Sequence, residues 1–97
     1  MDTIPIGIDP YVLGTLMRDL VGHDRRPSAY LVYLGLLGEA QDARAGLSHA
    51  LLAQRTGLSK RAVQDALAHL VQRKLIEVRR GALTEAAYYR VLSPWRR

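Results

Sequence analysis

The chain has 97 residues, of which 48% are hydrophobic, and this suits one globular domain rather than a disordered chain. It has no cysteine, which excludes disulfides, thiol catalysis, cysteine-ligated zinc fingers and iron–sulfur clusters. The longest apolar run is far shorter than a membrane span, and the first residues lack the basic and apolar regions of a signal peptide. We therefore expect a cytoplasmic protein with no membrane partner.

The formal net charge of +5 is divided unevenly along the chain. Residues 1–47 hold four basic and six acidic side chains and carry −2, whereas residues 48–97 hold ten basic and three acidic ones and carry +7. Such an asymmetry within one domain predicts that the second half faces a polyanion. From charge alone, a basic surface that serves only solubility stays open as the alternative.

A first amphipathic helix is predicted over residues 10–21. Asp9 and Pro10 form a typical helix start, because aspartate caps free backbone N–H groups and proline suits the first helical position. Gly22 is the expected stop, since glycine favours the position that follows a helix. Apolar residues at helical spacing predict one buried side, formed by Val12, Leu13, Leu16, Met17, Leu20 and Val21.

A second helix is predicted over Ser28–Ala43, and it is apolar on most of its sides. Such a helix must be buried on most sides. One interpretation makes it the central helix of a monomer. The other, which we favour because a chain of 97 residues offers few partners, places part of it in a homodimer interface. The candidate interface residues are Tyr30, Tyr33, Leu34 and Leu37.

Two short helices and a β-hairpin are predicted in the basic half. Ser48 is the expected N-cap of a third helix that ends near Thr56, and Ser59 caps a fourth helix over Lys60–Lys74. Between them, Gly57 allows the left-handed backbone of a tight turn. Alternating apolar and polar residues then predict strands over 75–80 and 88–92, with a loop over 81–87 and a tail over 93–97.

Residues 52–70, which read LAQRTGLSKRAVQDALAHL, resemble the motif of the winged helix-turn-helix DNA-binding family. Every anchor of the family pattern is present except one, since Ala62 stands where threonine is common. The resemblance covers residues 47–92 and implies a mainly α fold with a small β-hairpin, a winged helix-turn-helix with two additional N-terminal helices. The single domain, 1–97, then comprises the N-terminal helices with the dimer interface (1–46), the helix-turn-helix (47–74), the wing (75–92) and a basic tail (93–97).

The resemblance implies that the outer side of the helix after Gly57 enters the major groove of double-stranded DNA. Lys60 and Arg61, in the first turn of that helix, support this independently. The helix macrodipole disfavours a cation at that end by roughly 0.3–1 kcal/mol, and docking against phosphates would reverse the sign. The candidate DNA-binding residues are Ser48, His49, Ser59, Lys60, Arg61, Gln64, Asp65, Ala68, Arg79 and Arg80.

Four of these residues lie on the outer side of the fourth helix, and each has two interpretations. Arg61 suits guanine O6 and N7, and Gln64 suits adenine or a phosphate, with a solvated helix surface as the alternative for both. Asp65 either accepts from a cytosine amino group or, as we favour, holds Arg61 four residues earlier. Ala68 either lets the helix sit deep in the groove or is simply a good helix former.

The other candidates are expected at the DNA backbone. Ser59, Lys60 and His49 suit phosphates, His49 because it lies near the amino end of the third helix. Arg79 and Arg80 at the hairpin approach suit phosphates or an adjacent minor groove. The loop between the strands is uncharged apart from Glu85, which speaks against base reading by the tip of the wing.

Catalysis and metal binding are not expected. His23, His49 and His69 are scattered, with no second histidine or carboxylate at metal-ligand spacing, and no cofactor motif is present. Tyr88 and Tyr89 suggest base-stacking platforms, but adjacent strand residues face opposite ways, so at least one is expected in the core.

The sequence therefore predicts a sequence-specific, nucleoid-associated protein that binds double-stranded DNA. It is expected to regulate transcription as a homodimeric repressor that occupies an operator, with neither an enzymatic activity nor a small-molecule ligand. Two alternatives stay open. One is a DNA-binding module of a plasmid or phage replication or partition system, and the other is a winged helix used for protein–protein assembly.

Overall fold

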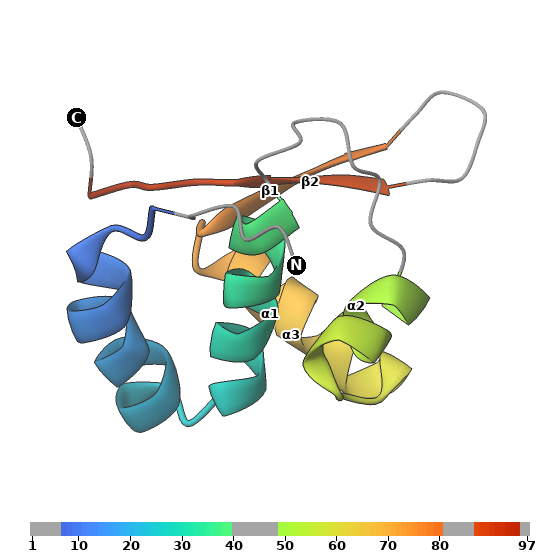
Figure 1. Cartoon of the computed structure of the whole chain (residues 1–97), viewed down its shortest axis with the longest axis horizontal. Coiled ribbons are helices and arrows are strands. Elements are labelled where there is room, and N and C mark those ends of the chain that lie inside the picture. The colour runs from blue at the N-terminus through green and yellow to red at the C-terminus, as the bar shows by residue number, and fades with distance from the viewer. Residues whose placement is uncertain (1–6, 40–48, 81–86, 96–97) are drawn as a thin grey trace, which may run out of the picture.

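The computed structural model describes residues 7–39, 49–80 and 87–95, and shows a helix-rich chain that ends in a β-hairpin (Figure 1). This confirms the expectation of a mainly helical fold with a small hairpin. A first helical segment over residues 10–23 contains two π-helical stretches, η1 (Val12–Leu16) and η2 (Arg18–His23). The remaining elements are α1 (Pro27–Glu39), α2 (His49–Thr56), α3 (Lys60–Gln72), β1 (Ile76–Arg80) and β2 (Ala87–Val91).

The first helical segment begins where the sequence predicts but ends later. Asp9 Oδ1 accepts a hydrogen bond from the Tyr11 backbone N–H at 3.0 Å, which confirms the predicted cap. The stop at Gly22 is wrong, because the helical turns continue to His23. The chain reverses instead at Arg25, whose φ is 55°, and the Arg26 N–H donates to the Leu20 carbonyl at 2.7 Å. Here an arginine takes the left-handed conformation that glycine usually supplies.

Helix α1 is the central helix of a single chain. It packs against η2 on one side, against α2 and α3 on the other, and against β2 (Figure 1). Its buried residues are Ala29, Tyr30, Val32, Tyr33 and Leu36. Other parts of the same chain therefore supply the partners that this apolar helix needs. Among the described residues, no helix has the length and apolar character to cross a membrane.

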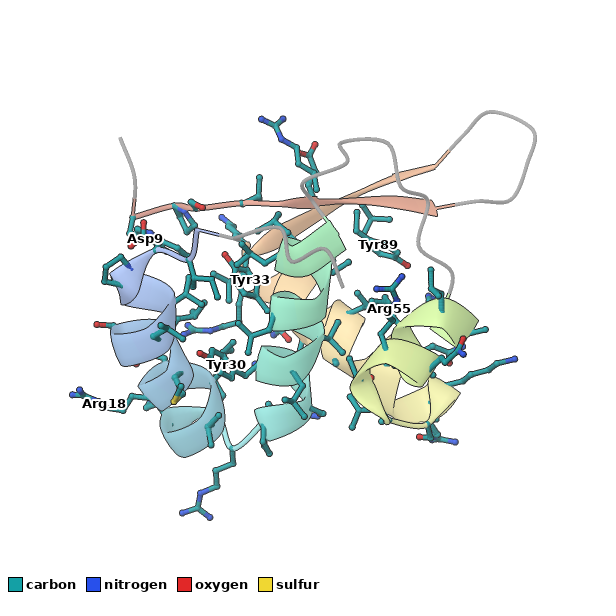
Figure 2. The ribbon with its side chains drawn as sticks, viewed as in Figure 1. Asp9, Arg18, Tyr30, Tyr33, Arg55 and Tyr89 are labelled. Carbon is teal, nitrogen blue, oxygen red and sulfur yellow. The ribbon has the colours of Figure 1, made fainter. Side chains whose placement is uncertain are left out.

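The assignment of Tyr30 and Tyr33 to a homodimer interface needs correction. Tyr30 is 5% exposed and Tyr33 is fully buried, and both lie between α1 and its neighbours in the same chain (Figure 2). The Tyr30 hydroxyl donates to the Val12 carbonyl at 2.9 Å, and the Tyr33 hydroxyl donates to the Leu92 carbonyl at 3.1 Å. Burial raises the pKa of both hydroxyls, which keeps them protonated as donors. Leu34 and Leu37, the other two candidates, are half-buried against the same core.

The turn between α2 and α3 has the predicted local structure. Gly57 has a φ of 79°, and Ser59 Oγ accepts the Ala62 N–H at 3.1 Å as the N-cap of α3. Leu58 is half-buried and packs against the core between the two helices. The inner side of α3 is buried through Val63, Ala66, Leu67 and Leu70. These contacts fix the direction in which α3 leaves the turn.

Helix α3 ends two residues earlier than predicted. Lys74 has a φ of 60°, so it cannot continue the helix. Its N–H donates to the Val71 carbonyl at 3.0 Å, and the Leu75 N–H donates to the Leu70 carbonyl at 2.9 Å. This pair of bonds is a Schellman motif with lysine at the position that usually holds glycine.

The hairpin pairs β1 with β2 in antiparallel register, with Val78 opposite Tyr89. A further bond, from the Leu92 N–H to the Leu75 carbonyl at 2.9 Å, extends the contact beyond both strands. The chain then reaches Trp95, which stacks on Tyr11 at a ring distance of 4.3 Å. The loop predicted over 81–87 is one residue shorter at its end, because β2 begins at Ala87; residues 81–86 and the end of the basic tail at 96–97 lie outside the described residues.

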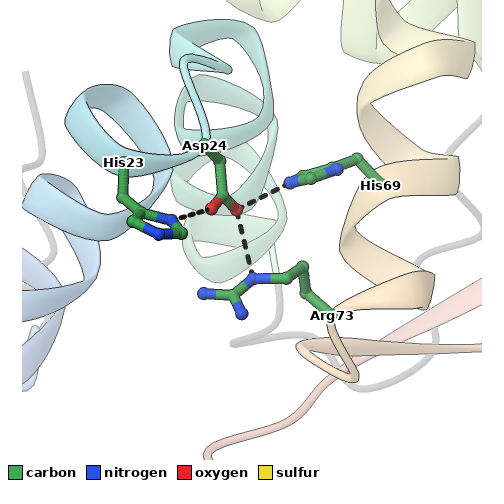
Figure 3. Close-up of polar contacts among 4 residues, drawn as sticks. All are labelled: His23, Asp24, His69 and Arg73. Carbon is green, nitrogen blue, oxygen red and sulfur yellow. Dashed lines mark hydrogen bonds and ion pairs between the residues drawn. The ribbon is translucent and has the colours of Figure 1, made fainter.

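An ion cluster joins α3 to the segment that precedes α1 (Figure 3). Asp24 Oδ1 accepts from His23 Nδ1 at 2.9 Å, while Oδ2 accepts from His69 Nε2 at 2.8 Å and from Arg73 Nε at 3.1 Å. The Asp24 side chain is only 8% exposed. The hydrogen bond from His23 lowers the pKa of Asp24 below its ordinary value of 3.8, and His69 and Arg73 lower it further. Burial raises the pKa, because desolvation disfavours the charged carboxylate, but the lowering effects are larger together. The carboxylate therefore stays ionised and anchors the far end of α3 to the N-terminal half.

Candidate nucleic-acid interface

The outer side of α3 has the composition that the sequence predicts. Its exposed residues stand opposite the buried side formed by Val63, Ala66, Leu67 and Leu70. Because those four are fixed in the core, the exposed side is presented by a helix that is held in place. The exposed residues of this side are Lys60, Arg61, Gln64, Asp65 and Ala68.

The amino end of α3 is electrostatically unusual. Its first turn holds Lys60 and Arg61 and no acidic residue, although the macrodipole favours the opposite arrangement. Ser59 satisfies the Ala62 N–H, and the cations stand exposed beside it. Such an end attracts phosphates through both the helix dipole and two side-chain charges.

The structure does not show the expected contact between Asp65 and Arg61. Within residues 7–39, 49–80 and 87–95, neither side chain has an ion-pair partner. Both are exposed, and an exposed pair at this spacing gains only about 0.3–0.5 kcal/mol, too little to hold two long side chains together. Arg61 is therefore not committed to a neighbour within the described part of the chain.

His49 and Gln64, both expected to contact DNA, contact each other. Gln64 Nε2 lies 3.3 Å from His49 Nδ1, and His49 Nε2 lies 3.0 Å from the Tyr89 hydroxyl oxygen. Both ring nitrogens of His49 thus have partners within the protein, so a phosphate contact by His49 requires breaking one of these bonds. Tyr89 in β2 is half-buried and packs against the core, as expected of at least one of the two tyrosines (Figure 2).

Three of the sequence candidates have little structural description. Ser48 lies outside the described residues. Arg79 and Arg80 occupy the last two positions of β1, opposite Tyr88 and Ala87. The hairpin therefore carries two arginines at the end farthest from the Leu75–Leu92 contact, where the sequence predicts an approach to the DNA backbone.

The histidines are less scattered than the sequence suggests, because His23 and His69 meet on one carboxylate. Asp24 Oδ2 also accepts from the Arg73 guanidinium, so this cluster already holds a permanent positive charge where a metal ion would have to sit. Among the described residues, no group of three or more histidine, aspartate or glutamate side chains is arranged to hold a metal ion. The cluster's evident role is to connect elements 45 residues apart in sequence.

Comparisons of the chain with protein-family models, with curated proteins and with solved structures returned no match. A functional conclusion for this protein rests on the placement, charge and hydrogen bonding of its own residues.

Proposed function

We propose that the chain is a winged helix-turn-helix protein that binds double-stranded DNA sequence-specifically and represses transcription by occupying an operator. The proposal rests on one observation, the exposed outer side of α3, whose first turn holds Lys60 and Arg61. Support also comes from the order of elements, in which α2, a glycine turn and α3 are followed by a hairpin whose approach carries Arg79 and Arg80.

The proposed contact follows from the dimensions of B-DNA. Its major groove is about 12 Å wide and admits an α-helix. With the amino end of α3 at the groove wall, Lys60 and the N-terminal amides meet phosphates, while Arg61 and Gln64 reach base edges. Ala68 keeps the middle of the helix narrow where it passes deepest. The arginines of β1 add sequence-independent phosphate contacts, which strengthen binding without selecting a base.

The homodimer remains part of the proposal, but with a different interface. Leu13, Met17 and Val21 are 52%, 39% and 39% exposed and stand four residues apart on the first helical segment. That segment lies across α1 from α2 (Figure 1). The half of the chain that contains it carries −2, so two copies can meet there without bringing their basic surfaces together. We propose that a second copy of this chain covers these side chains.

Sedimentation of wild type and of Met17→Lys tests the dimer. The wild-type chain should sediment as a dimer at micromolar concentration, and a buried lysine should convert it to a monomer while leaving its helical signal unchanged. A wild-type monomer removes the dimer from the proposal. A dimer that Met17→Lys leaves intact contradicts this interface.

The central experiment is selection of bound sequences from a random duplex pool at several salt concentrations. Enrichment of one sequence is expected, arranged as two half-sites about one helical turn apart if the dimer binds. The logarithm of affinity should fall linearly with the logarithm of salt concentration, with a slope set by the phosphates contacted.

An unselective, salt-insensitive result contradicts DNA binding and favours a winged helix used for protein–protein assembly. An enriched site in a plasmid or phage replication or partition region would favour the module interpretation over a transcriptional repressor.

A further inference from the structure

We propose that His49 determines which base Gln64 reads, by fixing the orientation of the Gln64 side-chain amide. This rests on the proposed function and deepens it, because it names a positioning residue and a base preference for the same surface. The observation behind it is the chain of contacts from Gln64 on α3, through His49 on α2, to Tyr89 on β2.

The direction of each hydrogen bond follows from the chemistry of the atoms. Gln64 Nε2 carries two hydrogens and can only donate, so His49 Nδ1 must be the acceptor at 3.3 Å. An imidazole that accepts at Nδ1 is neutral and carries its hydrogen on Nε2. His49 Nε2 therefore donates to the Tyr89 hydroxyl oxygen at 3.0 Å. The Tyr89 hydroxyl accepts that hydrogen, and the lone pair on His49 Nδ1 favours the Nε2 end of the Gln64 amide turning inward.

Two of the three residues in this series of contacts, His49 and Tyr89, lie in the body of the protein. His49 is the first residue of α2 and is half-buried, and Tyr89 is half-buried and held in β2 by its pairing with Val78. Of the three residues, only Gln64 is exposed. The hairpin thus holds a side chain of α3 through one imidazole, although Tyr89 and His49 are 40 residues apart in sequence.

The fixed amide presents a defined edge to DNA. One hydrogen of Gln64 Nε2 is donated to His49, so the second hydrogen and Oε1 remain for a base. This donor–acceptor pair matches N7 and the N6 amino group of adenine. It does not match guanine, whose N7 and O6 both accept. An unrestrained glutamine amide rotates broadly about its last torsion, so its donor and acceptor would be in this arrangement only part of the time and the preference would be weaker.

The test is competition binding to duplexes that carry the selected site, each changed at one base pair. Gln64→Ala should identify one A·T pair and reduce its preference over G·C by about 5- to 150-fold, the range of one bidentate contact. His49→Phe, which removes both hydrogen bonds, should weaken the preference at that same pair. The preferences at the other base pairs of the site should stay as in wild type.

Two further variants separate positioning from general structure. In His49→Asn, Oδ1 stands near the place of Nδ1 and accepts from Gln64, so most of the preference should return. Adding His49→Phe to Gln64→Ala should cause no further loss at that pair, because His49 acts there only through Gln64. Tyr33→Phe is the matched control, because it removes a hydroxyl bond to the Leu92 carbonyl that involves neither His49 nor Gln64, and it should leave the preference unchanged.

The possible failures are distinguishable. If wild type selects no sequence, the proposed function fails and this inference falls with it. If wild type selects a site but His49→Phe keeps the preference at the Gln64 position, DNA binding stands and the role of His49 is wrong. Equal loss at every position would also overturn the role of His49, because it would indicate a structural defect. Should His49→Phe fail to fold, Tyr89→Phe replaces it, with weakened preference at the same pair as the supporting result and unchanged preference as the contrary one.

Discussion

Two regions of this protein, the N-terminal half and the outer side of α3, place their polar side chains differently. In the N-terminal half, Asp9, Asp24, Tyr30 and Tyr33 all turn to partners elsewhere in the fold. On α3, the polar and charged residues of one side stand in solvent. Both halves contribute buried side chains to the core, and α3 in addition presents an outer side of exposed polar and charged residues.

The comparison also refines what the charge asymmetry means. Not every cation of the basic half is available to an external partner, because Arg73 bonds to the buried Asp24 and Arg90 lies 4.0 Å from Glu77. Lys60 and Arg61, in contrast, have no ion-pair partner among the described residues. The amino end of α3 is therefore a more specific signal for an anionic partner than the net charge of the half that contains it.

Breaking the ion cluster should have the largest effect on stability. Asp24→Ala removes the acceptor shared by His23, His69 and Arg73, and should lower the free energy of unfolding by about 3 kcal/mol. Urea denaturation measures this loss. The matched control is Asp65→Ala, an exposed carboxylate without an ion-pair partner in the described structure, which should change stability by less than about 0.5 kcal/mol. Equal effects of the two substitutions would contradict a stabilising role for the cluster.

Removing a cation from α3 should have the next largest effect, on binding instead of stability. Arg61→Ala should weaken binding to the selected site by about 1–3 kcal/mol and relax the choice of one base pair. Stability should stay equal or rise slightly, because a charge that opposes the macrodipole is lost. Arg90→Ala serves as the control for net charge, and it should weaken binding to all sequences alike or not at all. A uniform loss in Arg61→Ala would assign Arg61 to a phosphate.

Acid should weaken the connection between the halves. The pKa of Asp24 is lower in the folded protein than its ordinary value of 3.8, so its contribution to stability is complete above that value. The contribution is lost as the pH falls from 3.8 through the lowered folded pKa. The stability difference between wild type and Asp24→Asn should shrink over this range, as measured by urea denaturation from pH 6 downward. A difference that stays constant to the lowest pH would mean that the ionised carboxylate does not contribute.

The smallest expected effect is a gain in stability at the end of α3. Lys74 has a left-handed backbone that costs a side chain roughly 1 kcal/mol, and Lys74→Gly should recover about 0.5–1 kcal/mol without changing sequence preference. Gly57→Ala should have the opposite sign, because Gly57 also has a positive φ. Thermal denaturation compares the two, and destabilisation by Lys74→Gly would show that the lysine side chain has a role of its own.

Short-range signals in the sequence were sufficient to predict much of the local structure. Asp9, Gly57 and Ser59 act within a few residues of their own positions, and the structure confirms all three. The two sides of α3 follow from helical periodicity, so its exposed candidates were also predictable. The stop at Gly22 was wrong because a helix ends where tertiary contacts make it end, and here the reversal falls at Arg25, beside the buried Asp24.

The helical character of the chain, the turn before α3, the charge at the start of that helix and the presence of a hairpin all follow from local signals in the sequence. The burial of Tyr30 and Tyr33, the three donors to Asp24 and the contact between Gln64 and His49 emerge only when the elements pack together. The reason is physical. Caps and periodic faces depend on neighbours within one or two turns. Apart from the bond between the adjacent His23 and Asp24, these contacts join residues 15 to 59 positions apart, and only the packing of whole elements brings them together.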